Sequence, residues 1–564
     1  MDPLGSVTIN EWRTHSPLGE ADFVELFNCG PGSVDLSGAG LTDVVGDNGF
    51  RFPPGTVLPP GGFHVVYEEQ LGFTLRSSGE HLVLFNPSRS RVIDSVKYGP
   101  QGLGISSGRF PDGQPEIQHL THATPGSQNS PPTPAPVIIN ELMFHPLSGD
   151  DNEEYIELFN PGAHAVDLSG WKLTKGITFT FPLGTTLAPG GYVVVAKDRT
   201  RLQAKYPHLN STTLLGDYGG VLGDDGDRIA LVRPVAIVVE VGGISMNQLA
   251  DAVVEEFEYQ TGGAWGTWAD RGGSSLERVD VRADARRPSS WADSDESEKA
   301  PWTLVEFTGV LDHAARSSDP ADALDLVLLG EGECLVDDVE ARVGAGANLV
   351  RNPDFATSFA FWSPQGNHVR SARSTDPTDP GSTVLHLRAS SQGDTGANRI
   401  RSNLGSVINK GDTATLRARV RWLKGWPEVV LRLRGNGLEA YGRLHVSSQP
   451  GSPGLRNSRA VLNAGPSLDQ LSHWPVLPRA DEPIQVSVRV GDPDGIDAVG
   501  LRYRVDPSQV LLEVPLRDDG QGPDRFAGDG RFSGQIPGQA RNAMVAFWIE
   551  ATDAAASPGV SLCT

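Results

Sequence analysis

Several short sequence anchors occur twice, in the same order, within the first half of this chain. The repeated anchors are Ile9-Asn10-Glu11 with Ile139-Asn140-Glu141, Glu25-Leu26-Phe27-Asn28 with Glu157-Leu158-Phe159-Asn160, Asp35-Leu36-Ser37-Gly38 with Asp167-Leu168-Ser169-Gly170, and Pro60-Gly61-Gly62 with Pro189-Gly190-Gly191. Matches on separate anchors in a conserved order indicate a duplicated domain. A module used in tandem more often binds or spaces than catalyses.

Turn-forming residues dominate the composition and favour short β-strands. The 564 residues include 66 Gly and 42 Pro, and polar and apolar residues alternate between the turns. Each copy is predicted to contain about seven short antiparallel strands, which is typical of an immunoglobulin-like sandwich. The sequence therefore predicts an all-β fold built as a string of β-sandwich domains, at a length that suits roughly three to five of them.

The boundaries of the two copies follow from the anchors and from a proline-rich stretch. The first copy is predicted at 1–129 and the second at 137–297, with the linker 130–136 between them as an extended, semi-rigid spacer. The second copy carries insertions at about 206–220 and 234–252, which are expected to be loops between strands. Residues 199–206 and 247–258 are the segments that could form a helical turn or two.

These anchors resemble the lamin-tail domain, an immunoglobulin-like module of nuclear lamins and of many bacterial surface proteins. The resemblance rests on the opening Val137–Pro146, on Glu157–Asn160, Leu168–Trp171 and Leu187–Gly191, and on the close Ala123–Asn129. It implies a binding or structural module with no agreed ligand. It also implies an extracellular or cell-envelope location.

The third predicted domain, residues 298–447, has a different architecture. Asn348–Phe355 resembles the opening strand of carbohydrate-binding jelly rolls, whereas Leu335–Val339 resembles the closing strand of such a domain and yet comes first. Neither half supplies the eight strands that a jelly roll needs, so we expect one domain with permuted strand order. A linker is predicted at 448–463.

The last predicted domain, residues 464–556, is an immunoglobulin- or fibronectin-like sandwich, followed by a truncated tail at 557–564. This domain order resembles the front part of large secreted bacterial proteins, several of which continue into a CotH-like kinase domain. The chain is therefore expected to continue at both ends, and a signal peptide, absent here, to have been lost by truncation. The alternative function is that of an accessory region of such an enzyme, whose catalytic domain would lie beyond Thr564.

The charge and the cysteines exclude several classes of protein. A net charge of −23 disfavours a nucleic-acid partner, because phosphate binding needs an excess of Lys and Arg. No apolar run is long enough for a membrane span. The three cysteines, Cys29, Cys334 and Cys563, lie in separate segments and fit neither a disulfide framework nor a metal-site spacing.

Alternating arginines in the third domain are the strongest candidate for a binding surface. Because successive side chains of a strand point to opposite faces, Arg417, Arg419 and Arg421 are predicted to line one surface. The pattern recurs at Arg399, Arg401, Arg432 and Arg434. Guanidinium groups suit carboxylate or sulfate, and Trp426 and Tyr441 could stack on sugar rings, so an anionic polysaccharide is the predicted partner. The alternative is that these arginines pair with acids of a neighbouring domain.

Acidic loops in the last domain offer the hard oxygen ligands that Ca²⁺ requires. The candidates are Asp492, Asp494, Asp518, Asp519, Asp524 and Asp529. The alternative is that they form ordinary hairpin and Asx turns. No other cofactor is expected.

No sequence motif for catalysis is present: we find no Gly-x-Ser-x-Gly elbow, no His-Glu-x-x-His and no phosphate-binding loop with its Lys. The leading prediction is a non-catalytic binding or scaffold protein of the cell exterior that recognises polysaccharide through its third domain.

Overall fold

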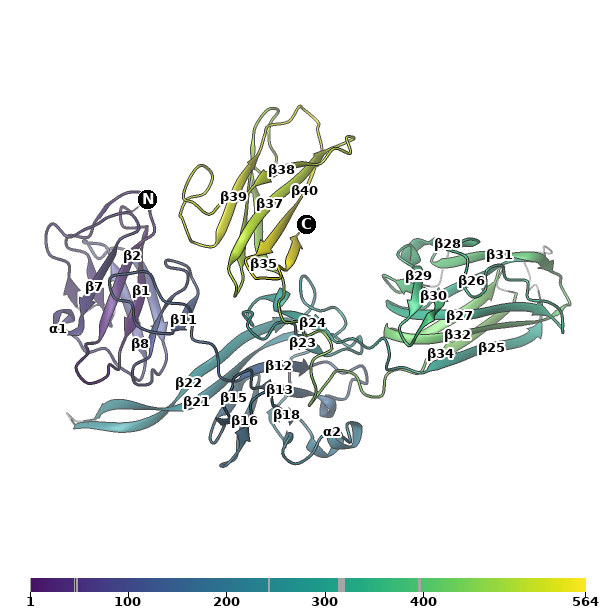
Figure 1. Ribbon diagram of the computed structural model, residues 1–564, viewed down its shortest axis with the longest axis horizontal. Coiled ribbons are helices and arrows are strands. Elements are labelled where there is room, and N and C mark those ends of the chain that lie inside the picture. The colour runs from purple at the N-terminus through teal and green to yellow at the C-terminus, as the bar shows by residue number, and fades with distance from the viewer. Residues whose placement is uncertain are drawn as a thin grey trace.

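Nearly all of the regular secondary structure is β-strand, which confirms the predicted all-β fold (Figure 1). The computed structural model describes residues 2–44, 46, 49–241, 244–312, 320–393, 397–435 and 437–563. Within these ranges the α-helices are α1 (Glu68–Leu71) and α2 (Arg199–Lys205). The second of them falls where the sequence predicted a helical turn.

The first copy is a sandwich of two main sheets. Its strands are β1 (Val7–Arg13), β2 (Phe23–Asn28), β3 (Val34–Asp35), β4 (Gly40–Thr42), β5 (Phe50–Arg51), β6 (Val57–Leu58), β7 (Phe63–Tyr67), β8 (Glu80–Phe85), β9 (Val92–Tyr98), β10 (Ser106–Arg109) and β11 (Ile117–Leu120). One sheet has the order β11-β10-β1-β2-β7 and the other β5-β4-β8-β9. The alternating apolar residues meet between them, with Trp12 and Leu26 fully buried.

The second copy repeats this plan with additional strands. Its strands are β12 (Ile138–Met143), β13 (Tyr155–Phe159), β14 (Val166–Asp167), β15 (Lys172–Lys175), β16 (Ile177–Thr180), β17 (Thr186–Leu187), β18 (Tyr192–Ala196), β19 (Leu214–Gly216), β20 (Gly219–Gly220), β21 (Gly226–Val241), β22 (Ile244–Gln260), β23 (Leu276–Arg278) and β24 (Trp291–Asp293). The pairing of β1 with β2 is interrupted between Ile9 and Glu11, and that of β12 with β13 between Ile139 and Glu141. The same bulge at the same repeated anchor confirms the duplication in three dimensions.

The insertion predicted as a loop at 234–252 is instead the middle of a long hairpin formed by β21 and β22. The helical turn predicted at 247–258 is also wrong, because those residues belong to β22. The hairpin extends from the second copy toward the first (Figure 1). There the hydroxyl of Ser77 donates to the carbonyl of Val238 at 3.1 Å and accepts from its amide at 3.0 Å. This arm therefore links the two copies directly.

The proline-rich stretch 130–136 is not a free spacer along its whole length. The amide of Thr121 donates to the carbonyl of Pro131 at 3.0 Å, and the amide of Thr133 donates to the carbonyl of His119 at 2.8 Å. Residues 131–133 thus extend the sheet next to β11, where proline is tolerated because it lies at an edge.

The third domain is a sandwich of two five-stranded sheets. Its strands are β25 (Trp302–Val310), β26 (Ala321–Leu328), β27 (Gly332–Val343), β28 (Trp362–Gln365), β29 (Ala372–Asp376), β30 (Asp379–Ala389), β31 (Arg399–Ile408), β32 (Thr413–Gly425), β33 (Glu428–Leu433) and β34 (Glu439–Arg443). The sheet orders are β25-β32-β27-β30-β29 and β28-β31-β26-β33-β34. Each sheet mixes strands from before and after Asn348, and one hydrophobic core lies between them.

Residues 448–463, for which the sequence predicts a linker, instead complete the second copy. In the first copy the amides of Thr124 and Gly126 donate to Glu11 and Glu25, at 3.0 and 2.6 Å. In the second copy the amides of Ser452 and Gly454 donate to Glu141 and Glu157 in the same way, at 2.8 and 2.5 Å. We call residues 451–459 the closing segment. The third domain is therefore inserted into the second copy, ahead of that copy's last segment.

The fourth domain packs against both copies. Its strands are β35 (Ser467–Trp474), β36 (Ile484–Gly491), β37 (Ile496–Val505), β38 (Leu512–Pro515), β39 (Arg531–Ile536), β40 (Val545–Asp553) and β41 (Val560–Cys563). Strand β41 pairs with β40, so the predicted tail is part of a sheet; Thr564 lies outside the described residues. Arg489 of this domain binds Glu116 of the first copy at 2.5 and 2.6 Å, and Arg287 of the second copy pairs with Asp469.

Candidate functional sites

The arginines of β32 lie on the outer face of the first sheet of the third domain. Arg419 binds Asp337 and Asp338 at 2.9 and 2.7 Å, and Arg421 binds Asp376 at 3.1 Å. Arg417 lies 3.8 Å from Glu306. Leu416, Ala418 and Val420 point the other way, into the core, as strand alternation predicted.

The remaining arginines lie on the outer face of the other sheet. Arg401, Asp325, Arg432 and Glu439 are register neighbours on four adjacent strands. Arg401 binds both carboxylate oxygens of Asp325 at 2.7 and 2.8 Å, and Arg432 binds Glu439 at 2.6 Å. The sheet is thus crossed by a row of alternating charges.

Two further arginines belong to this second face. Arg399 lies 3.8 Å from Asp325, and Arg434 binds Asp322 at 2.8 Å.

The seven predicted arginines are therefore divided between opposite faces of the sandwich, and each has a carboxylate within 4 Å. The acids come from other strands of the same domain and not from a neighbouring one. These acidic partners were not found from the sequence, because strand pairing joins residues that are far apart in the chain. Binding of an anionic glycan by these arginines stays a prediction.

The two predicted aromatic residues lie together at the edge of the second face. Trp426 is 48% exposed, and its indole N–H donates to Glu428 at 3.2 Å. The neighbouring carboxylate of Glu428 raises the pKa of the Tyr441 phenol. Arg443 also binds Glu428, at 3.2 Å. Glu428 is thus the shared partner of Trp426, Tyr441 and Arg443, and both aromatic rings stay about half exposed.

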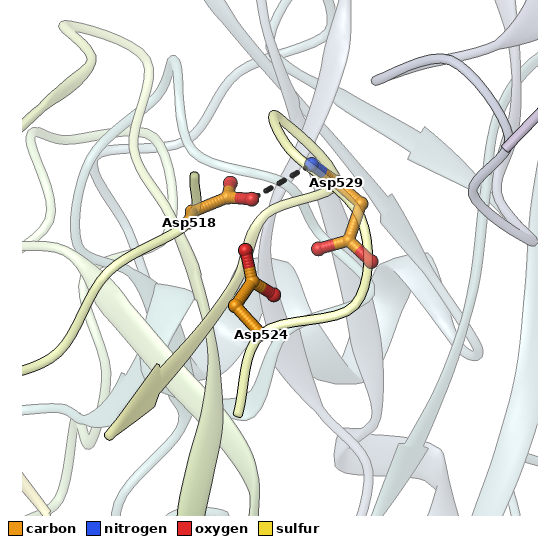
Figure 2. Close-up of side chains that lie close together, drawn as sticks. All are labelled: Asp518, Asp524 and Asp529. Carbon is orange, nitrogen blue, oxygen red and sulfur yellow. Dashed lines mark hydrogen bonds between the residues drawn. The ribbon is translucent and has the colours of Figure 1, made fainter. Parts of the chain in front are cut away.

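Three of the six predicted calcium ligands converge in the fourth domain (Figure 2). Among the described residues, carboxylate oxygens of Asp518, Asp524 and Asp529 all lie within 4.8 Å of one another. Asp518 accepts the amides of Asp529 and Gly530 at 3.1 and 2.8 Å. Burial, and then the charge of the neighbouring aspartates, raises the pKa of Asp518 to about 6. The trio could supply part of the oxygen shell that Ca²⁺ requires.

The other three predicted ligands lie elsewhere. Asp519 accepts the amide of Gln521 at 3.0 Å, as in an Asx turn. Asp494 binds Arg282 of the second copy at 2.8 Å, and Asp492 accepts the amide of Asp494 at 2.7 Å. Asp492 and Asp519 thus accept amides as in the turn interpretation, whereas Asp494 forms an ion pair between domains. Calcium binding by these three residues stays a prediction.

The sequence prediction missed a buried group of carboxylates beneath the closing segment. Glu141, Glu157 and Glu277 are fully buried in the second copy. Burial, and then repulsion from Glu277, raises the pKa of Glu141 to about 7, and burial raises the pKa of Glu157 well above its usual range. The signal was present in the sequence, because Thr124-Pro125-Gly126 and Asn129 recur as Ser452-Pro453-Gly454 and Asn457.

Comparison with protein families identifies the duplicated domain. The Lamin Tail Domain model matches residues 2–100 and 130–256, so the chain contains two lamin-tail domains, each with the immunoglobulin-like sandwich described above. None of the curated proteins is significantly similar to the chain in sequence. Among the described residues, no helix has the length and apolar character needed to cross a bilayer.

Solved multidomain structures resemble the chain only weakly. A Ca²⁺-stabilised adhesin that helps an Antarctic bacterium bind ice has 10% identity and a TM-score of 0.13, over 99% of this chain and 96% of its own. Trypsin-activated alpha-2-macroglobulin from Escherichia coli has 12% identity and a TM-score of 0.19, over 99% and 41%. The eight N-terminal Ig domains of Down Syndrome Cell Adhesion Molecule have 8% identity and a TM-score of 0.12, over 99% and 84%. Scores this low carry no functional argument.

Proposed function

We propose that this protein is a non-catalytic scaffold of the cell surface, whose lamin-tail and fourth domains hold the third domain in a fixed orientation as the ligand-binding module. On this proposal the third domain has the jelly-roll character inferred from its sequence and recognises polysaccharide. The binding role belongs to the third domain because it alone projects from the other three (Figure 1).

The observation that carries the proposal is the insertion of the third domain into the second lamin-tail domain. The chain leaves that domain after β24 and returns at the closing segment, where the ammonium of Lys299 donates to the carbonyl of Gly451 at 2.6 Å. A domain joined at both ends cannot swing as one on a single linker does. Fixed orientation is what a display module requires.

The supporting domains are also fixed to one another. Glu116, Arg287 and Arg489 come from three different domains and meet in one group of ion pairs. Arg489 is nearly buried, and ion pairs protected from water are screened less by salt than exposed ones. A platform of this kind suits an environment of variable ionic strength outside the cell.

Immunolabelling of the cells that naturally produce the protein tests the proposal. Antibodies against the third domain should label intact, unpermeabilised cells, while antibodies against a cytoplasmic marker should label only permeabilised cells. Labelling of the third domain only after permeabilisation would contradict a surface role. Turnover of any substrate by the purified chain would contradict the non-catalytic assignment.

A further inference from the structure

A cleft of about 1220 Å³ lies between the second lamin-tail domain and the third domain. One wall includes Trp268 and Arg271 of the lamin-tail domain, and the other includes Glu331, Gln392 and Trp426 of the third domain. Pockets for single drug-sized ligands measure about 300–1,000 Å³. This cleft therefore has room for a chain of several rings.

The two walls of the cleft are held together by a direct contact. The amide of Gly425 donates to the carbonyl of Gly272 at 2.8 Å. Next to it, the buried ring of Trp422 lies so close to Gly273 that a Cβ there would be 2.5 Å from the ring. Because the closing segment ties the third domain to the same lamin-tail domain, the cleft is preformed and binding requires no ordering of its walls.

Trp426 offers a stacking surface inside this cleft. A Cβ on Gly330 would lie 2.5 Å from the indole, so the ring packs directly on the backbone of a glycine. About half of Trp426 stays exposed, and Glu428 already satisfies its indole N–H. The apolar faces of sugar rings stack on such exposed indoles. Stacking would bury the apolar surface of the Trp426 indole, and removing apolar surface from water is favourable.

Unpaired polar side chains surround this aromatic surface. The side chains of Arg271, Glu331 and Gln392 are exposed, and they form no hydrogen bond or ion pair with any residue that the structure describes. They supply a guanidinium donor, a carboxylate acceptor and an amide that does both. Sugar hydroxyls donate and accept, so this mixed set matches them.

The charges that line the cleft balance one another. Beside Arg271 and Glu331, the lining holds the acids Glu153, Asp270 and Glu428 and the bases Arg201, Lys205 and Arg443. Glu153 pairs with Arg201 at 3.0 Å, and Glu428 pairs with Arg443. A polyanion would meet as many repulsive as attractive groups here, so an uncharged ligand fits better.

We propose that this interdomain cleft binds an uncharged oligosaccharide, which stacks on Trp426 and forms hydrogen bonds with Arg271, Glu331 and Gln392. The proposal rests on the scaffold function proposed above and names its ligand class. It also moves the site from the arginine faces of the third domain to its junction with the lamin-tail domain.

Isothermal titration of the intact chain with a panel of hexasaccharides tests this inference. The panel contains cellohexaose, chitohexaose, xylohexaose, mannohexaose and maltohexaose, with an alginate hexamer as the charged comparison. At least one uncharged member should bind, and its affinity should not change between about 0.05 and 0.5 M NaCl, because screening acts only on charge. Trp426→Ala should weaken binding by about tenfold or more, which corresponds to about 1.4 kcal/mol.

Matched variants separate the cleft from other surfaces. Trp474→Ala removes a tryptophan that is 69% exposed in the fourth domain and should leave affinity unchanged. Arg271→Ala should weaken binding about threefold to tenfold without altering the fold, since its side chain has no intramolecular partner to lose. No binding of any uncharged hexasaccharide at millimolar concentration, binding that Trp426→Ala leaves intact, or binding of alginate alone would each overturn the inference. None of these three binding results would change the surface labelling of intact cells, which tests the scaffold function separately. Failure of the ligand proposal can therefore be distinguished from failure of the scaffold proposal.

Discussion

The side-chain amide of Asn457 donates to the backbone carbonyl of Asn140 at 3.0 Å, across a separation of 317 residues. The same amide donates to the carbonyl of Arg278 at 2.9 Å. Asn129 forms the equivalent pair of bonds, to Asn10 and Arg109, in the first lamin-tail domain. The closing segment is therefore a conserved part of the duplicated unit, separated from it in sequence by the inserted domain.

Asn457→Ala should release the closing segment. The change removes three buried hydrogen bonds, since Asn457 also accepts the side-chain amide of Asn140 at 2.7 Å. Buried polar groups left without partners cost about 1–3 kcal/mol. Hydrogen exchange of the intact chain should accelerate across residues 451–459 and across β12 and β23. Asn129→Ala is the control, which should produce the same effect in the first lamin-tail domain alone. Unchanged protection of residues 451–459 would show that Asn457 does not hold them.

Glu25 should make the first lamin-tail domain less stable as the pH rises. Burial raises the pKa of this carboxyl group from 4.5 to about 8, so the folded state holds a proton that the unfolded state releases. Its contribution is fully present below about pH 4.5 and is lost as the pH rises through about 8. Glu25→Gln keeps an uncharged acceptor for the amide of Gly126 and should flatten this dependence. The measurement is hydrogen exchange at residues 123–129, corrected for intrinsic rates, from pH 6 to 9; an equal slope in both proteins would contradict it.

Glu116→Ala should loosen the contact between the first and fourth domains. The change leaves the guanidinium of Arg489, which is nearly buried, without its carboxylate. Removing one partner of such a pair costs about 1–3 kcal/mol. Small-angle scattering should report a larger maximum dimension. Glu513→Ala is the control, because its partner Arg502 lies in the same domain; an identical scattering curve for both variants would mean that Glu116 does not join the domains.

Calcium should stabilise the loop that holds Asp518, Asp524 and Asp529. Because the pKa of Asp518 is raised to about 6, the folded loop without metal loses stability as the pH rises from about 4 through 6. A divalent cation replaces the proton, so its effect should be larger at pH 7 than at pH 5. Slower hydrogen exchange at residues 516–531 with millimolar Ca²⁺ is the expected result. Asp524→Asn should abolish it and Asp519→Asn should not. No response to Ca²⁺ at pH 7 would leave these residues as turn formers.

Arg401→Ala and Arg434→Ala should differ in their effect on stability. Arg401 neutralises Asp325, whose side chain is 6% exposed, so its loss leaves a buried charge and should cost roughly 2–3 kcal/mol, less than the value of about 3–5 for a fully buried pair. Arg434 is 57% exposed, and its ion pair should contribute less than about 1 kcal/mol. Hydrogen exchange in β26 and β31 measures the difference. Equal loss of alginate binding by both variants, without loss of stability in either, would instead favour the predicted anionic-glycan surface.

The duplication and the all-β class could be predicted from sequence because both depend on local patterns. Repeated anchors and alternation survive in the linear order, and the bulges at Asn10 and Asn140 confirm them. The hairpin formed by β21 and β22 was misread in part as helical, because Asn247–Glu258 also has apolar residues at helical spacing. Pairing with β21 decided the outcome, and pairing is a long-range interaction.

The sites were harder to predict for the same reason. The sequence allowed the arginines of β31, β32 and β33 to pair with acids of a neighbouring domain, whereas their partners Asp325, Asp337 and Asp376 lie on other strands of the same domain. The closing segment appeared to be a linker because its partners precede it by some 300 residues. Trp426 was found from sequence, but Arg271 was not, because the cleft is formed by two domains.

The insertion points of the third domain lie side by side, since Lys299 contacts Gly451. Any module whose own two ends are adjacent could occupy this position without disturbing the lamin-tail core, whose final segment would still reach its place. The second lamin-tail domain therefore carries a complete inserted domain without losing the segment that closes its own core.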